Sequence, residues 1–180
     1  INQKLIEMKL ALSIVFTLIL SIGYAQGLQE SFDASCNCWT VTNHFDNGQV
    51  SSEHTENAAR KKNGTATTYN ANGIIIRQEN WNNGQLDGTS TSYHHDGSIY
   101  LEANYNNGTK IGTWTFKDLD GTPTQEIEYN GTSGDATYSH YYGGVKYIEQ
   151  TVVNGQMVTN NILNQELYDQ VQAEALQTTK

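Results

Sequence analysis

A regular spacing of glycines constrains this chain more than any other feature of its sequence. Two sets of three glycines follow each other at a shift of 24 residues: Gly84, Gly88 and Gly97, then Gly108, Gly112 and Gly121. A third and slightly shorter set follows at Gly131, Gly134 and Gly143. A fixed period in this range is typical of stacked copies of one supersecondary unit, so the chain is expected to be a repeat protein.

The residues around these glycines predict β-hairpins. Asn-Gly and Asp-Gly pairs accept positive φ at low cost and are the strongest short hairpin signals. Between them lie short runs rich in Thr, Tyr, Ile and Val, which predict strands. We therefore expect an all-β fold, an elongated single-layer antiparallel meander in which each hairpin packs on the next. The glycines assigned to turns are Gly48, Gly64, Gly73, Gly84, Gly88, Gly97, Gly108, Gly112, Gly121, Gly131, Gly134, Gly143 and Gly155.

The pattern changes to that of a helix near the C-terminus. Leu163, Leu167, Val171 and Ala175 recur every four residues, which predicts a helix over residues 162–177 with Asn164 as its N-cap. We expect this helix to pack over the last repeat, and the alternative is a free interaction tail. The expected organisation is therefore as follows: an N-terminal segment at 26–42, hairpin repeats at 43–160, and a C-terminal helix and tail at 161–180.

The first residues have the pattern of a secretory leader. Met8-Lys9 gives a basic end, residues 10–22 are nearly all apolar or small, and Ala25 stands where a signal peptidase would cleave. The apolar run is shorter than the roughly 20 residues that a membrane-spanning helix needs. We predict an upstream extension at 1–7, a signal peptide at 8–25 cleaved between Ala25 and Gln26, and export to the periplasm or beyond. An uncleaved anchor is the alternative. After removal of the leader, no membrane span is expected.

Charge and cysteine content narrow the possible partners further. The full chain has 10 basic and 19 acidic residues, and removing Lys4, Lys9 and Glu7 leaves 8 and 18, a net charge of −10. Such a surface repels phosphate backbones, so we expect no nucleic-acid partner. The two cysteines, Cys36 and Cys38, are too few for a structural zinc site. A local disulfide between them is possible in an exported protein, and free or intermolecular thiols are the alternative.

The repeat resembles a known family. The run Gly84-Gln-Leu-Asp-Gly88, followed by a Thr/Ser/Tyr strand and Asp96-Gly97, is similar to the MORN repeat and closer to the bacterial variant found in antitoxin-like repeat proteins. The resemblance covers residues 43–158. It implies an elongated, curved β-sheet scaffold with no catalytic centre, used as a protein-interaction or membrane-associated module. The chain departs from the lipid-associated members because it lacks basic patches.

The aromatic side chains are the candidate binding residues. Trp81, Tyr105 and Tyr129 recur every 24 residues and should form one row on the sheet, and Tyr93 and Trp114 complete the candidate set. We favour a packed row, and the alternative is an exposed row that stacks on sugars. His, Asp and Glu pairs fit polar turns better than metal or catalytic sites, so no catalytic residue, metal or cofactor is predicted.

These observations predict an exported, non-catalytic repeat scaffold with a protein partner. Two alternatives come from other features of the sequence. The aromatic rows suggest a carbohydrate or cell-envelope binding module, and a glycan is then the partner. The family resemblance alone suggests an antitoxin-like neutralising partner, although an export leader would not suit a protein that neutralises an intracellular toxin.

Overall fold

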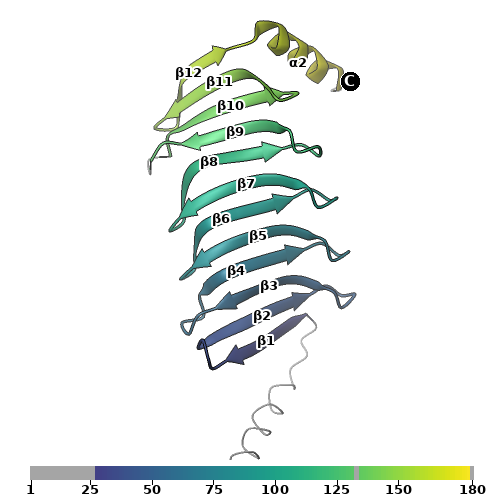
Figure 1. The fold of residues 1–180 in the computed structure, drawn as a ribbon, viewed down its shortest axis with the longest axis vertical. Helices are drawn as coiled ribbons and strands as arrows, with labels where there is room; N and C mark the ends of the chain where they lie inside the picture. The colour runs from purple at the N-terminus through teal and green to yellow at the C-terminus, as the bar shows by residue number, and fades with distance from the viewer. Residues whose placement is uncertain (1–26, 132–133, 179–180) are drawn as a thin grey trace, which may run out of the picture.

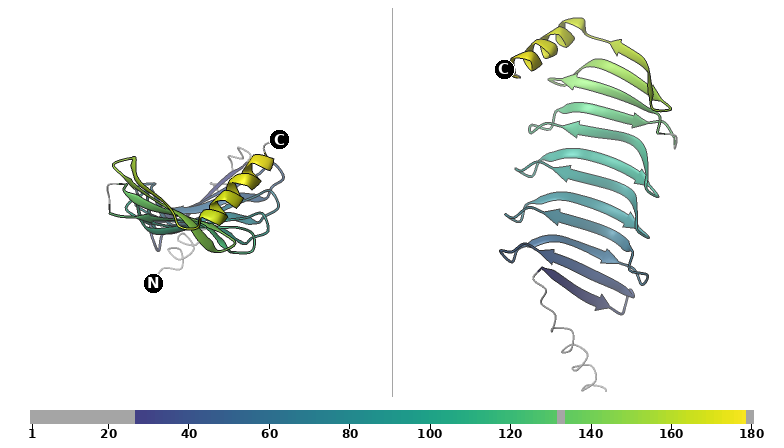
Figure 2. Two further views of the ribbon diagram at one scale, coloured as in Figure 1. Left: turned by 90° about the horizontal axis from the view of Figure 1, so that it is seen from above. Right: turned by 180° about the vertical axis from the view of Figure 1, so that it is seen from behind.

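The computed structural model describes residues 27–131 and 134–178, which form one open β-sheet followed by a helix (Figure 1). The predicted upstream extension, the signal peptide and the cleavage site at Ala25 and Gln26 lie outside the described residues. In end view the sheet is curved and forms a single layer (Figure 2). The predicted elongated, all-β hairpin meander is therefore confirmed.

Twelve strands make up the sheet, and they pair in chain order, each antiparallel to the next. Their bounds are β1 Leu28–Asp33, β2 Cys38–His44, β3 Val50–Glu56, β4 Lys62–Tyr69, β5 Ile75–Asn82, β6 Gln85–Tyr93, β7 Ile99–Asn106, β8 Thr109–Lys117, β9 Pro123–Tyr129, β10 Ala136–Tyr142, β11 Val145–Val153 and β12 Gln156–Ile162. The sheet therefore starts at Leu28, within the N-terminal segment that precedes the predicted repeats.

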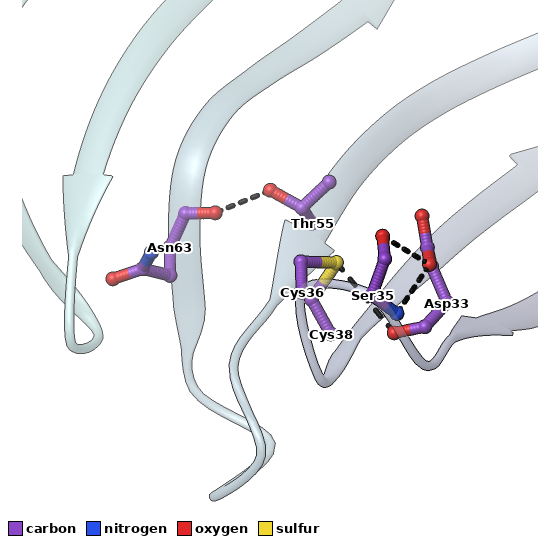
Figure 3. Close-up of a disulfide and its surroundings, with 6 residues drawn as sticks. All are labelled: Asp33, Ser35, Cys36, Cys38, Thr55 and Asn63. Atoms are coloured by element: carbon purple, nitrogen blue, oxygen red, sulfur yellow. Dashed lines mark hydrogen bonds between the residues drawn. A yellow bond between two sulfur atoms is a disulfide. The ribbon is translucent and has the colours of Figure 1, made fainter.

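The hairpin between β1 and β2 is closed without an Asn-Gly turn. Cys36 and Cys38 form a disulfide, with Cα atoms 5.2 Å apart (Figure 3). Asn37 between them adopts a positive φ of 51°. Asp33 accepts hydrogen bonds from the backbone N and the Oγ of Ser35, which lowers the pKa of its carboxyl group. The loop is thus fixed by side chains, which explains why the glycine spacing does not reach this hairpin.

Tight turns between strands follow the expected Asn-Gly chemistry. Asn83 and Gly84 have φ of 50° and 85°, and Asn107 and Gly108 have φ of 46° and 80°. Positive φ at both central residues is the pattern of a type I′ turn, whose twist matches that of the flanking strands. The longer loops, which lie at the opposite ends of the strands, use one glycine in this conformation, such as Gly97 with φ of 90°.

Three of the glycines assigned to turns lie inside strands instead. Gly64, Gly88 and Gly112 belong to β4, β6 and β8, with φ of 98°, 99° and 60°. The pairing of each strand with the one before it is irregular beside the glycine, as in a β-bulge. On its other side each glycine pairs with a large aromatic residue: Trp81, Tyr105 and Tyr129, respectively. These glycines bend the strand and leave room for the aromatic ring. The spacing of glycines alone does not distinguish such a strand position from a turn.

Side-chain hydrogen bonds connect three of the tight turns to the hairpin before them. The backbone N of Asn83 donates to Oδ1 of Asn63 at 3.2 Å, and that of Asn107 donates to Oδ1 of Asp87 at 3.3 Å. The same contact recurs where the N of Asn154 donates to Oδ1 of Asp135 at 2.8 Å. Neighbouring hairpins are therefore joined at the turns as well as along the strands.

The C-terminal helix α2 spans Gln165–Thr178. It begins three residues later than the predicted range of 162–177, because β12 continues to Ile162 and Asn164 caps the helix. Asn164 caps it, because its Oδ1 accepts a hydrogen bond from the backbone N of Leu167 at 3.0 Å. The helix lies beside the end of β11, and the hydroxyl of Tyr142 donates to Glu174 at 2.8 Å. None of its residues is fully buried. Within the described residues, no helix is long and apolar enough to cross a membrane.

Candidate interaction surface

The predicted aromatic row is part of the packing of the sheet. Trp114 in β8 is buried, with its ring centroid 5.1 Å from that of Tyr105 and 5.2 Å from that of Tyr129. Its indole N donates to the carbonyl O of Asn104 at 3.1 Å. The buried cluster around it consists of Ala103, Trp114, Ile127 and Ala136, with Leu101, Tyr105, Phe116, Tyr129 and Tyr138 packed against it.

Lysine side chains lie over the aromatic rings. Lys110 Nζ is 4.7 Å from the ring centroid of Trp114 and 5.3 Å from that of Tyr129, and Lys62 Nζ is 4.8 Å from that of Trp81. These distances are those of cation–π contacts. Burial raises the pKa of Tyr105 above its ordinary value. Four of the five candidate binding residues are thus held together or covered by the protein itself.

Tyr93, the fifth candidate, belongs to a polar ladder along the strands. Its hydroxyl donates to Oε1 of Gln78, 15 residues earlier, at 3.0 Å. One repeat later Lys117 donates to Glu102 over the same interval at 2.5 Å, and in the next repeat Tyr141 donates to Glu126 at 2.5 Å. Gln78, Glu102 and Glu126 are aligned across the sheet through Thr91 and Thr115.

This ladder lies on the face opposite the aromatic cluster. Thr115 and Glu126 form a cross-strand pair next to the pair of Trp114 and Ile127, and successive residues of a strand point to opposite faces. Burial, and then the hydrogen bond to Glu126, raises the pKa of Tyr141 to about 12. The ladder was not among the features predicted from the sequence. Its acceptor residues Gln78, Glu102 and Glu126 recur every 24 residues, and this recurrence is the sequence signal that would have indicated it. In the described part of the chain, no group of three or more His, Cys, Asp or Glu residues is arranged to hold a metal.

Exposed apolar side chains gather at the C-terminal end of the sheet. Seven of the 14 large hydrophobic residues that are exposed in the structure lie in β10 to α2, namely Tyr142, Val145, Met157, Val158, Ile162, Leu163 and Leu176. Every residue of β12 is exposed. We call β12, Leu163 and α2 the C-terminal surface. Apolar side chains gathered in one exposed place are typical of an interaction site.

The charges of this surface are negative. The described helix α2 carries Glu166, Asp169 and Glu174 and no basic residue. Hydrogen bonds from Gln170 and then from Tyr142 lower the pKa of Glu174, so it is ionised at neutral pH. The chain as a whole has a net charge of −9. The surface therefore combines an uncharged strand that carries three exposed apolar side chains with an acidic helix.

Among known proteins, the informative match is to a repeat family, over two segments of the chain. No curated protein matches the chain. One solved structure, titled "Crystal structure of GtfA/B complex", is similar to 57% of this chain and to 22% of its own chain, at 13% identity and a TM-score of 0.33. The chain thus spans about a fifth of that protein.

The family match falls in the middle of the sheet. Residues 62–83 and 86–107 both match the MORN repeat variant. The first segment covers β4 and β5, and the second covers β6 and β7. Repeats of this type form scaffolds for protein or membrane interaction and are generally non-catalytic. Residues 62–83 and 86–107 are thus similar to the MORN repeat variant, and they lie within a sheet that continues the same hairpin pattern on both sides.

Proposed function

We propose that this protein is an exported, non-catalytic scaffold that binds a protein partner through its C-terminal surface. The observation that carries the proposal is the exposure of two apolar pairs at the last strand of the sheet, Met157 and Val158 near its start and Ile162 and Leu163 at its end. Covering exposed apolar groups at one end of a rigid repeat array removes them from water, which lowers the free energy of the complex with a partner. The aromatic row supports carbohydrate binding less well, because its rings contact one another and lysine side chains.

Capture of partners by the purified protein tests the proposed surface. Wild-type protein and the double variant Met157→Lys, Val158→Lys would be immobilised and exposed to envelope extract, and bound proteins would be identified by mass spectrometry. We expect the double variant to lose the partners that wild type retains. Leu119→Lys is the matched control, because Leu119 is 53% exposed in the loop between β8 and β9, which β10 and β11 separate from β12. Retention by the double variant, or equal loss in the control, contradicts the proposal.

Export is a separate part of the proposal. It is supported by the basic, apolar and small-residue order of residues 8–25 and by the disulfide of Cys36 and Cys38, which suits an oxidising compartment. Cell fractionation with N-terminal sequencing tests it. We expect a mature chain that starts at Gln26 outside the inner membrane, whereas an intact chain held in the membrane or the cytoplasm contradicts export.

A further inference from the structure

Within the described residues, the outer edge of β12 pairs with no other strand, and neither charged residues nor proline protect it. Natural sheets protect their edges with charged residues, proline or a covering element, because free N–H and C=O groups attract another strand. The segment Gln156–Ile162 contains no charged residue and no proline. Met157 and Val158 are both 56% exposed. The register between β11 and β12 shifts at Val158, as in a β-bulge, so these two apolar side chains lie at an irregular point of the edge.

The opposite edge of the sheet is protected. Strand β1 carries Glu30 and Asp33, and Arg60 forms an ion pair with Glu30. A strand approaching β1 would therefore meet charged side chains on that strand, whereas β12 itself carries none. The two edges of the same sheet thus differ in their capacity to accept another strand, and only β12 is suited to it.

Helix α2 adds negative charge beside the end of this edge. It follows β12 after Leu163 and Asn164, so its first turns lie next to the Ile162 end of the strand (Figure 1). Asp169 accepts a hydrogen bond from the neutral Gln165, and Glu166 stands in the first turn. The last turn carries no basic residue in the described helix. Near the start of α2 the carboxylates of Glu166 and Asp169 would attract a cation supplied by a partner, against the positive end of the helix dipole.

We propose that the β12 edge binds an extended, apolar segment of a partner protein, which joins the sheet as a further strand and places a basic residue beside α2. This rests on the proposed function and specifies the partner's chemistry. All eleven strand pairs of the sheet are antiparallel, and the added strand continues that order. In that orientation the N-terminal end of the segment lies next to Ile162, so the basic residue precedes the apolar run. Main-chain hydrogen bonds supply affinity, and the apolar and basic side chains supply selectivity.

Binding of synthetic peptides to the purified protein tests this assignment. The probe is a fluorescent peptide with two lysines followed by alternating Thr and Val, and binding is followed by fluorescence anisotropy. Two matched peptides serve as controls: one has glutamates in place of the lysines, and one has N-methyl groups on alternate amides of the apolar run. We expect the lysine peptide to bind, the glutamate peptide to bind roughly tenfold more weakly, and the methylated peptide not to bind.

Variants of the protein separate the edge from the charge. Val158→Lys should abolish binding of the lysine peptide, while Leu119→Lys leaves it unchanged. Glu166→Gln with Asp169→Asn should weaken the lysine peptide about fivefold and leave a peptide with glutamines in place of the lysines unaffected. Circular dichroism confirms that α2 persists in these variants.

Several results would overturn the proposal. They are equal binding of the methylated peptide, binding that is insensitive to Val158→Lys, and a preference for the glutamate peptide. Concentration-dependent dimerisation that Val158→Lys removes would also overturn it, because the occupant would then be a second copy of the chain. If peptides fail while partners are still captured through Met157 and Val158, the strand mechanism is wrong and the proposed function stands.

Discussion

The two halves of the sheet share one backbone repeat, yet different side chains hold their hairpins together. Near the N-terminus the guanidinium of Arg60 lies 4.6 Å from the ring centroid of Trp39 and pairs with Glu56 at 3.0 Å. Over β7 to β10 one face of the sheet carries an apolar cluster, with Trp114 and Ile127 buried at its centre. The hairpin geometry therefore comes from the turns and bulges, while the side chains between strands can be ionic or apolar.

This difference has an energetic consequence. Burial of a large apolar side chain contributes a few kcal/mol, whereas an exposed ion pair contributes at most about 1 kcal/mol. The C-terminal half should therefore be the more stable part of an array whose units depend on their neighbours. A stable half next to an unprotected edge gives the C-terminal surface a rigid support.

Truncation of Trp114 and of Trp39, one from each half of the sheet, should give the largest difference in the free energy of unfolding. Trp114→Ala should lower the free energy of unfolding by about 3–5 kcal/mol, because it removes a buried ring and its hydrogen bond to Asn104. Trp39→Ala removes a partly exposed ring and should cost less than half as much. Urea unfolding followed by circular dichroism measures both. Equal losses would break the comparison.

The strand glycines should rank by the space that surrounds them. Gly64→Ala should be the most damaging, because a Cβ there would lie 2.8 Å from Oγ1 of Thr55, which is itself hydrogen-bonded to the carbonyl O of Asn63 (Figure 3). At Gly88 the nearest atom is 3.5 Å away, and at Gly112 nothing lies within 4 Å. In all three variants, the alanine must also adopt a positive φ, which costs about 1–2 kcal/mol of stability. The urea midpoint should be lowest for Gly64→Ala, higher for Gly88→Ala and highest for Gly112→Ala. A reversed order would show that crowding around the added Cβ does not determine the loss of stability.

Arg60 should behave differently toward two small replacements. It has a φ of 59° at a loop position where other repeats use glycine. Arg60→Ala loses the contacts of the side chain and keeps the unfavourable backbone, whereas Arg60→Gly loses the contacts and relieves the backbone. The glycine variant should therefore be more stable than the alanine variant by about 1 kcal/mol. If the two have the same thermal midpoint, the backbone of this loop carries no strain.

The smallest expected effect is a dependence on alkaline pH. The pKa of Tyr141 is raised from 10.0 to about 12 by burial and by Glu126. The folded state holds this proton more tightly than the unfolded chain does. Its contribution to stability is therefore complete below pH 10 and is lost as the pH rises through 12. Tyr141→Phe should flatten the decline of stability in that window, as urea midpoints at several pH values would show. An unchanged decline would assign it to other groups.

Much of this fold follows from the sequence because turns have strict backbone requirements. Asn83-Gly84 and Asn107-Gly108 are readable since few residue pairs tolerate two positive φ values. The same rule fails for Gly64, which serves a strand, and for Arg60, which adopts a positive φ without being glycine. Local pattern also missed the first hairpin, because a disulfide between Cys36 and Cys38 closes it instead of an Asn-Gly pair.

The candidate site was harder to predict than the fold. The 24-residue recurrence placed Tyr105 and Tyr129 on one face, but only the packing shows that Trp114 joins them and that Lys110 lies over the rings. The exposure of Met157 and Val158 depends on β12 being the last strand. A sequence pattern describes which residues face the same side, and it does not report what covers them.

Site-specific photo-crosslinking in cells tests the central claim most directly. A photoreactive benzoylphenylalanine would replace Val158 in β12, and Leu119, which is similarly exposed, would be replaced in a parallel experiment. Illumination followed by immunoblotting shows whether each position contacts another protein. We predict a defined cross-linked product in the cell envelope from position 158 and none from position 119. A product from position 119 alone, or none from either position, would contradict an interaction scaffold that works through its C-terminal surface.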